Sequence, residues 1–380
     1  MTRPIAREGN LETKPCANPS GQRGTNQQWV IYGLSSSSKI LNLYVTSDPP
    51  RLRTGDHDKT LNYGVSEVQI FLYDFQNNFN LSFPIDSAVE GITTAYNLDV
   101  TRRLVFFVPG YKSHISKNTE ELIRQTFSDV PNIYLIIVDH SAYTSAKGGK
   151  IASYERSVKH VFYIGSALAQ FLAGLHAKGY PSSKIHCIGH SLGSQMLGYT
   201  GSKYYELTNE KIWRVTGLDP AGPCFSNGPI EEQIRSGVGQ YVEIYHCNAG
   251  GLGSDSVLGD IDFFFNKKGK KQPPCHEGII PGKGESDADK CSHKACVRYY
   301  AMSVHMQNGF LASACDSYNE FQDGKCYRNQ VTLAGYNNPG NATGAHNVDA
   351  KTSEPLHTRN FNNQSLENIR FFDSRRFFFP

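Results

Sequence analysis

Three features that would place a chain in a broad functional class are missing from these 380 residues. There is little excess charge, since 38 basic residues face 35 acidic ones and leave a formal net charge of +3, so nothing indicates a nucleic-acid partner. No apolar run is long enough to span a bilayer, and we expect no transmembrane segment. The opening MTRPIAREGN also lacks the apolar core of a signal peptide.

Cysteine, in contrast, is present and clustered. Of nine cysteines, eight lie within residues 187–326 and only Cys16 stands apart. Such clustering favours local disulfides and therefore an oxidising compartment. Possible N-glycosylation triplets begin at Asn80, Asn341 and Asn363, which agrees with this interpretation. We expect a secreted, extracellular protein whose signal peptide is not present in this chain.

Strands and helices alternate through the centre of the chain. The runs RRLVFFVPGY and IYLIIVDHS are typical of strands buried on both faces of a sheet. Between them NTEELIRQTFSD has helical spacing, and residues 155–179 form a longer amphipathic helix that ends at a glycine. KIHCIG, KIWRVTGLD and QYVEIYH follow as further strands. This alternation predicts an α/β fold with a mostly parallel central sheet flanked by helices.

The two ends of the chain differ from this centre. Residues 1–60 carry clusters of proline, glycine and serine, and they predict an irregular arm with one strand near residues 40–45. Residues 61–352 are expected to form the α/β domain, with no C-terminal β-sandwich domain after it. The tail 353–380 is rich in asparagine and ends in FFDSRRFFFP. A docked strand, a membrane-seeking tip and an added segment all remain open for this tail.

The segment IHCIGHSLGSQ places a serine between two glycines, directly after an apolar strand. In a G-x-S-x-G pattern the serine lies on a sharp strand-to-helix turn, where side chains at the glycine positions would clash. A serine hydroxyl is a weak nucleophile, so it needs a histidine base and a carboxylate that orients the histidine. Asp219 ends the strand RVTGLD, and His293 follows in DKCSHKAC. Ser191, Asp219 and His293 are therefore the candidate catalytic residues.

Each of these residues also has a purely structural interpretation. Ser191 could be a buried turn residue, Asp219 could cap the following turn, and His293 is one of thirteen histidines. Their order in the chain, each at a predicted strand-to-loop junction, favours the catalytic interpretation. An oxyanion hole needs two backbone N–H groups, and the candidates are Leu192 and Tyr111, although the Pro-Gly pair before Tyr111 could be a simple β-turn.

Five ordered segments resemble signatures of the pancreatic-type lipases, within the animal lipase and phospholipase A1 superfamily, and in particular of their single-domain insect relatives. They are KIHCIGHSLGSQMLGYTG, VTGLDPAGPCF, YVEIYHCNAGGLG, GDIDFFFN with QPPC, and CSHKACVRYYAMS. The resemblance runs from about Val65 to about Thr352. It implies an α/β-hydrolase fold in which Ser191, Asp219 and His293 fall on the family's triad. Leu192 and Tyr111 fall on its oxyanion-hole positions.

The resemblance also implies a lid that covers the site, closed by a disulfide between Cys275 and Cys291. Only Ile279 and Ile280 are apolar in this Gly-rich, charged stretch, so it is a poor amphipathic helix. We expect such a lid to hide little acyl-binding surface, to give weak interfacial activation and to leave room for a polar headgroup.

Further cysteine assignments follow from the same resemblance. Cys315 and Cys326 match a second family disulfide. A bond between Cys247 and Cys296 is only a guess. Cys187 and Cys224 are candidates for buried free thiols.

Four departures from the family pattern stand out. Pro109 occupies a position that is usually histidine, and because proline has no N–H it cannot donate a backbone hydrogen bond there. His140 replaces a tryptophan. The hairpin NKKGKKQ is more basic than its family counterpart, which fits either a solvated loop or attraction to anionic lipid. The acidic calcium ligands of some members are absent from EEQIRSGVGQYVE. We expect no metal and no cofactor.

The leading hypothesis is a secreted serine ester hydrolase that acts on lipids, either a triacylglycerol lipase or a phospholipase A1. Its partner would be a lipid substrate or a lipid–water interface. The alternative is a catalytically weak or inactive lipid-binding or storage protein of the same fold, as in yolk proteins that resemble lipases. A third hypothesis is an interaction role for the basic hairpin or the aromatic tail. The lipid class, acyl length, oligomeric state and protein partners stay open.

Overall fold

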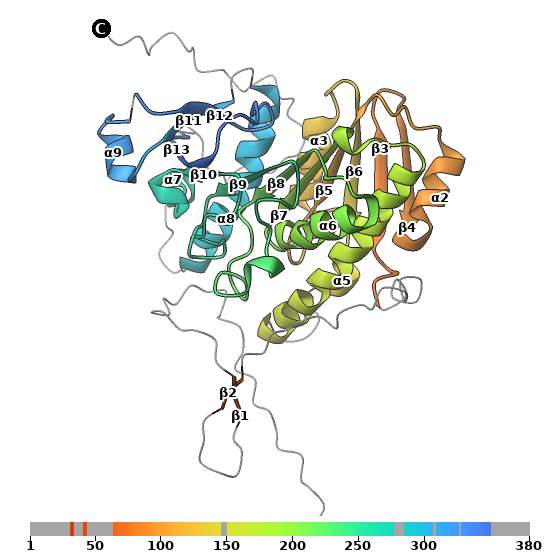
Figure 1. Cartoon of the computed structure of the whole chain (residues 1–380), viewed down its shortest axis with the longest axis horizontal. Helices are drawn as coiled ribbons and strands as arrows, with labels where there is room; N and C mark the ends of the chain where they lie inside the picture. Colours follow the sequence, from red (N-terminus) through yellow and green to blue (C-terminus); the bar gives the residue numbers. More distant parts are fainter. Residues whose placement is uncertain are drawn as a thin grey trace, which may run out of the picture.

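The computed structural model describes residues 31–33, 41–43, 64–145, 150–276, 285–306, 309–326 and 328–350 (Figure 1). Its strands are β1 (Ile31–Gly33), β2 (Leu41–Leu43), β3 (Gln69–Asp74), β4 (Phe79–Pro84), β5 (Arg103–Val108), β6 (Ile133–Asp139), β7 (Ile185–His190), β8 (Arg214–Leu218), β9 (Tyr241–His246), β10 (Ile261–Phe265), β11 (Phe310–Ala314), β12 (Val331–Ala334) and β13 (Gly344–Val348). Its helices are α2 (Ile85–Ala95), α3 (Asn118–Phe127), α4 (Ser141–Thr144), α5 (Lys150–Ala177), α6 (Leu192–Thr208), α7 (Pro273–His276), α8 (Glu285–His305) and α9 (Tyr318–Gln322). Short 3₁₀ turns are η1 (Ser182–Lys184), η2 (Ile230–Glu232) and η3 (Lys267–Gly269).

One large sheet organises the part of the chain that is described. Its strand order is β12-β11-β13-β10-β9-β8-β7-β5-β6-β3-β4. All neighbours from β6 through β13 pair in parallel, whereas β3 with β4 and β11 with β12 add antiparallel pairs at the two ends. The predicted α/β-hydrolase fold, with a mostly parallel sheet flanked by helices, is confirmed.

Burial follows the position of each strand in the sheet. All seven residues of β6 are buried, because helices cover both faces of a central parallel strand. The edge strand β4 alternates between half-buried and exposed residues, as a strand with one solvated face does. The continuous apolar run and the alternating one thus mark the centre and the edge of the sheet.

Helices cover the two faces of the sheet unequally. Helices α2, α5 and α6 pack on one face and share an apolar cluster that includes Ile92, Leu168 and Met196. Helices α3 and α8 cover the other face, where Phe127 and Tyr300 lie in a second cluster (Figure 1). Helix α8 is important for the site because it brings a late part of the sequence onto the central strands.

The expectation of no membrane-length apolar segment needs a qualification. Within α5, residues Ser153–Ala177 are long and apolar enough to cross a bilayer by length and composition alone, although half of the most apolar window is buried inside the protein. Its buried residues include Ile164, Leu168 and Leu172, which pack in the core. A core helix passes such a test because it is apolar on the side that faces the sheet.

The ends of the chain are described only in part. β2 lies within the strand predicted near residues 40–45, and it pairs with β1 in an antiparallel ribbon. The lid isoleucines Ile279 and Ile280, the glycosylation triplet at Asn363 and the tail 353–380 lie outside the described residues. Asn80 and Asn341, the other two triplet positions, are exposed.

Three disulfides join described cysteines. Cys275 bonds to Cys291 and Cys315 to Cys326, the two pairs that the resemblance implied, and Cys247 bonds to Cys296, the pair left as a guess. Cys187 is a buried free thiol, but the same expectation for Cys224 is wrong, because Cys224 is disulfide-bonded. The sequence could not separate these two cysteines, since pairing depends on which Cβ atoms the fold brings together.

Candidate active site

Ser191 occupies a strained turn between β7 and α6. Its backbone has φ 55° and ψ −118°, a conformation that costs free energy for a residue with a side chain and that persists at functional sites. The glycines on either side make the turn possible. A Cβ atom at Gly189 would lie 2.6 Å from the backbone of Ser194, and one at Gly193 would lie 2.1 Å from the carbonyl oxygen of Val108. The G-x-S-x-G pattern is therefore required by close packing of the backbone.

Asp219 lies at the carboxyl end of the neighbouring strand β8. The Ser191 amide donates to the Leu218 carbonyl at 3.0 Å, and the Ala221 amide donates to the Ser191 carbonyl at 3.1 Å, so the two turns are joined. Asp219 is fully buried. Its Oδ1 accepts hydrogen bonds from the backbone amides of Cys247 (2.7 Å) and Asn248 (2.9 Å). These two bonds fix the carboxylate and leave Oδ2 available to another donor.

His293 supplies that donor. Its Nδ1 lies 2.5 Å from Asp219 Oδ2, and because a carboxylate only accepts, Nδ1 carries a proton, which in the neutral ring leaves the lone pair on Nε2. This is the tautomer that a general base requires. The prediction that His293 lies at a strand-to-loop junction is wrong, because it lies inside helix α8. Cys291 and Cys296, which flank His293 and are both disulfide-bonded, lie in the same helix.

A disulfide connects the two halves of this arrangement. Cys247 donates its amide to Asp219, and its sulfur is bonded to Cys296, which lies one helical turn after His293. The bond therefore holds the turn of α8 that carries His293 against the backbone that holds Asp219. The sequence carried both cysteines but no sign of this role, because the contact spans 49 positions along the chain.

His190 is a site residue that the sequence analysis missed. It precedes Ser191, its Nε2 lies 3.3 Å from the His293 carbonyl oxygen, and its ring centroid lies 4.8 Å from that of His293. Burial, together with the neighbouring His293, holds the pKa of His190 well below its ordinary value. A neutral His190 therefore positions His293 without adding a charge. Its place inside the G-x-S-x-G pattern was the available signal.

The loop after β5 approaches Ser191 from the other side. A Cβ atom at Gly110 would lie 3.0 Å from Ser191 Cβ, so Tyr111 follows a residue in direct contact with the serine. Leu192 opens helix α6, whose first amides have no partner within the helix. These are the two oxyanion-hole candidates. The Tyr111 hydroxyl lies 2.5 Å from Ser153 Oγ, which ties the loop to α5.

Two of the departures from the family pattern contact each other. His140 Nε2 lies 2.9 Å from the Pro109 carbonyl oxygen and donates to it, while Nδ1 lies 2.7 Å from Thr144 Oγ1. Burial lowers the pKa of His140, so the ring is neutral. The loop that has no backbone donor at Pro109 is thus held through the Pro109 carbonyl by His140. Nothing in the residues themselves indicated this pairing.

A second histidine–aspartate pair lies behind the first. His246 Nε2 lies 2.8 Å from Asp262 Oδ1, and its Nδ1 lies 2.9 Å from the Ser254 carbonyl oxygen. Both partners only accept, so both ring nitrogens donate and His246 is an imidazolium ion. Burial alone would lower its pKa, but the hydrogen bond and the charge of Asp262 outweigh burial and raise the pKa.

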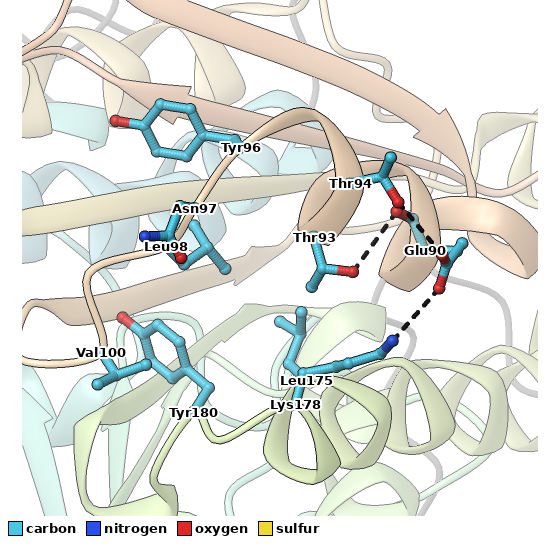
Figure 2. A pocket seen from close by; sticks show the side chains of 10 residues that line it. All are labelled: Glu90, Thr93, Thr94, Tyr96, Asn97, Leu98, Val100, Leu175, Lys178 and Tyr180. Atoms are coloured by element: carbon cyan, nitrogen blue, oxygen red, sulfur yellow. Dashed lines mark hydrogen bonds and ion pairs between the residues drawn. The ribbon is translucent and has the colours of Figure 1, made fainter.

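The pocket drawn in Figure 2 is at a different place. It is lined by the ends of α2 and α5 together with Leu98, Val100 and Tyr180, and Lys178 forms a 3.4 Å ion pair with Glu90 beside it. Residues 98–100 precede β5 and Tyr180 precedes β7, so this pocket lies at the amino edge of the sheet. Ser191 and Asp219 follow strands and lie at the opposite, carboxyl edge, where open α/β sheets bind ligands.

Comparison with known proteins is consistent with this geometry. A family model described as Lipase matches residues 45–363. Lipase member H from Xenopus tropicalis is 31% identical over 272 residues, which cover 71% of this chain and 55% of that protein. Pancreatic triacylglycerol lipase from Sus scrofa is 30% identical over 276 residues, covering 69% and 58%. The chain thus spans little more than half the length of the curated relatives it matches.

Solved structures are less similar. Est1E from Butyrivibrio proteoclasticus with bound ferulic acid has a TM-score of 0.26 and 14% identity, covering 40% of this chain and 49% of that one. MGS-M1, an α/β hydrolase from a deep-sea metagenome library, has a TM-score of 0.26 and 17% identity, covering 39% and 56%.

Proposed function

The chain belongs to the lipase family, and from this premise we propose that it is a serine ester hydrolase acting on lipids through Ser191, His293 and Asp219. The observation that carries the proposal is the contact of His293 Nδ1 with a buried, doubly anchored Asp219. It leaves Nε2 as a base on the histidine next to the strained Ser191 turn. Domain bounds of 61–352 are part of the same proposal.

In the proposed mechanism His293 Nε2 removes the hydroxyl proton of Ser191, and Ser191 Oγ attacks the acyl carbonyl carbon. The amides of Leu192 and Tyr111 donate to the oxyanion of the tetrahedral intermediate. His293 then gives the proton to the leaving alcohol, which leaves an acyl-enzyme. A water molecule, deprotonated by the same nitrogen, hydrolyses it and restores the serine.

Asp219 keeps the histidine in the required tautomer and stabilises the imidazolium ion that forms. It does so from a fully buried position, where its attraction to a cation is stronger than in water. His190 and the Cys247–Cys296 bond hold the histidine at this place. Each of these groups acts on the position or charge of His293.

The relatives and the disulfides bear on the substrate and the location of the protein. The relatives include proteins named lipase member H and pancreatic triacylglycerol lipase. We propose a triacylglycerol or a phospholipid as the substrate of this chain. Three disulfides between described cysteines support an extracellular location. Exposed asparagines in two glycosylation triplets agree with it.

The experiment that tests the proposal measures fatty-acid release from phosphatidylcholine and from a triacylglycerol with the same acyl chains. The wild type is compared with Ser191→Ala, and a fluorophosphonate probe reports whether the serine is activated. We expect serine-dependent release from at least one lipid and probe labelling that requires Ser191. The preferred lipid identifies the substrate class.

A folded protein that releases fatty acid from neither lipid and is not labelled would contradict the proposal. The lipid-binding or storage alternative would then be favoured, with Pro109 as its structural basis. Reversion of Pro109 to histidine, the usual residue of the family, would test whether that position had removed the activity.

A further inference from the structure

A strongly basic turn follows β10 at the same edge of the sheet as the candidate active site. We define the lysine turn as residues 266–271, with the sequence NKKGKK. Lys267, Lys268 and Lys270 are exposed. Lys271 interacts with another group of the protein, so only the other three lysines are considered. Because β8, β9 and β10 are parallel neighbours, the lysine turn and Asp219 both lie beyond the carboxyl ends of their strands.

The backbone of the lysine turn is unusual. Asn266, Lys267, Lys268 and Gly269 have φ values of 46°, 36°, 62° and 68°. Residues with side chains rarely adopt positive φ, and a run of them persists only where surrounding contacts enforce it. A plain solvated loop needs no such conformation.

Buried amide groups enforce this shape. Asn266 Nδ2 donates to Gln272 Oε1 at 2.8 Å, and Gln272 Nε2 donates to the carbonyl oxygens of Cys247 and Phe265, both at 2.9 Å. Both amide side chains are buried. A Cβ atom at Gly269 would lie 2.7 Å from the His246 carbonyl oxygen, so the turn packs directly on the end of β9. The exposed ammonium groups therefore project from a fixed base.

The same base holds the candidate triad. Asn248 donates its backbone amide to Asp219 Oδ1 and its side-chain amide to the Lys270 carbonyl oxygen at 3.1 Å. The backbone amide of Gln272 donates to Oγ of Ser292, the residue before His293. Asp289 also accepts from Asn248 Nδ2, so the contacts described for this base include one carboxylate, against three exposed lysines. The lysine turn thus has a defined position relative to the catalytic residues.

We propose that the lysine turn docks the carboxyl edge of the sheet onto an anionic lipid surface, so that the active site faces the lipid. The inference rests on the proposed function in that it names the surface on which the enzyme works. The formal net charge of the chain is only +3, so overall charge would give little attraction, whereas a local basic cluster attracts anionic headgroups within a Debye length. Lysine suits this role because its long side chain reaches the headgroups while the backbone stays fixed.

The test measures binding of the Ser191→Ala protein to vesicles, so that no turnover is needed. Vesicles of phosphatidylcholine are compared with vesicles in which about a third of the lipid is phosphatidylglycerol. The test variant is Lys267→Gln/Lys268→Gln/Lys270→Gln. Its matched control is Lys178→Gln/Lys184→Gln/Lys211→Gln, which removes the same charge at the amino edge of the sheet. Melting temperatures establish that both variants fold.

We expect the parent and the control to prefer anionic vesicles, and the test variant to lose about a hundredfold in partition coefficient, at about fivefold for each lysine. Raising the salt concentration should weaken binding of the parent and leave the test variant nearly unchanged. Equal binding of the parent to both kinds of vesicle would overturn the inference. The inference would also be overturned if the test variant bound vesicles as well as the parent but had lost binding to a sulfated polysaccharide. The turn would then bind a polyanionic chain and not a lipid surface. Failure of the proposed function shows separately, as absence of Ser191-dependent fatty-acid release.

Discussion

Two histidine–aspartate pairs adjoin each other, because His246 precedes Cys247, whose amide donates to Asp219, and the pairs differ in their hydrogen bonds. His293 meets Asp219 at 2.5 Å and His246 meets Asp262 at 2.8 Å. His246 has its second nitrogen bound to the Ser254 carbonyl oxygen, so both nitrogens donate and it cannot accept a proton. His293 bonds to its carboxylate through Nδ1, and Nε2 is the nitrogen that we propose as the base. The two histidines thus differ in the partner of the second ring nitrogen more than in the carboxylate.

The carboxylates differ in the same sense. Asp262 accepts from the amides of Leu258 and Gly259 as well as from His246, all within one loop and its strand. Asp219 accepts from amides of one segment and from a histidine of another, helix α8. The His246–Asp262 pair therefore closes a local loop, whereas the His293–Asp219 pair joins distant parts of the chain. We therefore expect substitutions in the His293–Asp219 pair to lower catalysis most, and substitutions in the His246–Asp262 pair to lower stability most.

The largest effect is expected from His293→Ala. Removing the base should lower kcat for a soluble short-chain ester by about 10⁵-fold or more, and the melting temperature should fall as well, because the buried Asp219 carboxylate loses its partner. Stopped assays of the variant and of Ser191→Ala should give similar residual rates, since the two residues act as a unit. A variant that retains most of its activity would remove His293 from the mechanism.

Asp219→Asn should lower kcat by about 10⁴-fold. Its Oδ1 would still accept from Cys247 and Asn248, so the new NH₂ group would face His293 Nδ1 and force the proton onto Nε2. Asp262→Asn is the matched variant and should chiefly lower stability. Steady-state kinetics and chemical denaturation of both variants check this contrast. Equal kinetic losses in the two variants would break the distinction between the pairs.

His246→Gln should lower the free energy of unfolding by about 3 kcal/mol, because it leaves the buried Asp262 carboxylate without its cation. The pKa of His246 is raised in the folded protein, so its contribution is full below the ordinary histidine pKa and is lost as pH rises through the raised value. Urea titrations at several pH values measure this. His346→Gln is the control, since His346 is buried without a carboxylate and burial lowers its pKa.

Glu120 extends the comparison to a buried carboxyl on α3 that lies near Asp139 and Lys294. Burial raises its pKa from 4.5 to about 7. The folded state therefore holds a proton that the unfolded state has released, and stability falls as pH rises between these values. Glu120→Gln should remove this slope, with a gain of about 3 kcal/mol at pH 8 and almost none at pH 4. An unchanged slope in melting temperature against pH would show that Glu120 does not cause it.

The smallest effect is expected from His140→Phe. The ring shape is kept, but the donor to the Pro109 carbonyl oxygen is lost, so the loop that carries Tyr111 should be less well placed. We expect kcat to fall by about tenfold, which corresponds to about one hydrogen bond, with KM nearly unchanged. His140→Gln, which keeps a donor, should recover part of the loss. A change in KM alone would place His140 in substrate binding.

Much of the fold could be predicted from the sequence because its signals are local. The apolar runs of β5, β6 and β7 and the glycine at the end of the long helix mark elements by composition and periodicity. Ser191, its two glycines, and Asp219 directly after a strand could be found in the same way. The strands β11, β12 and β13 and the helix α2 were not predicted, since their short or mixed runs carry no clear period.

The sequence by itself determined the parallel sheet and the serine turn, because a continuous apolar run and a glycine without a Cβ atom are local signals that need no knowledge of distant contacts. Only the tertiary structure decided that His293 lies on a helix, that Cys224 is bonded, and that His140 holds Pro109. It also decided that both ring nitrogens of His246 have acceptors, whereas His293 meets its carboxylate through Nδ1. These are contacts between residues that are distant in the chain, and their chemistry depends on which acceptor the fold places beside each nitrogen.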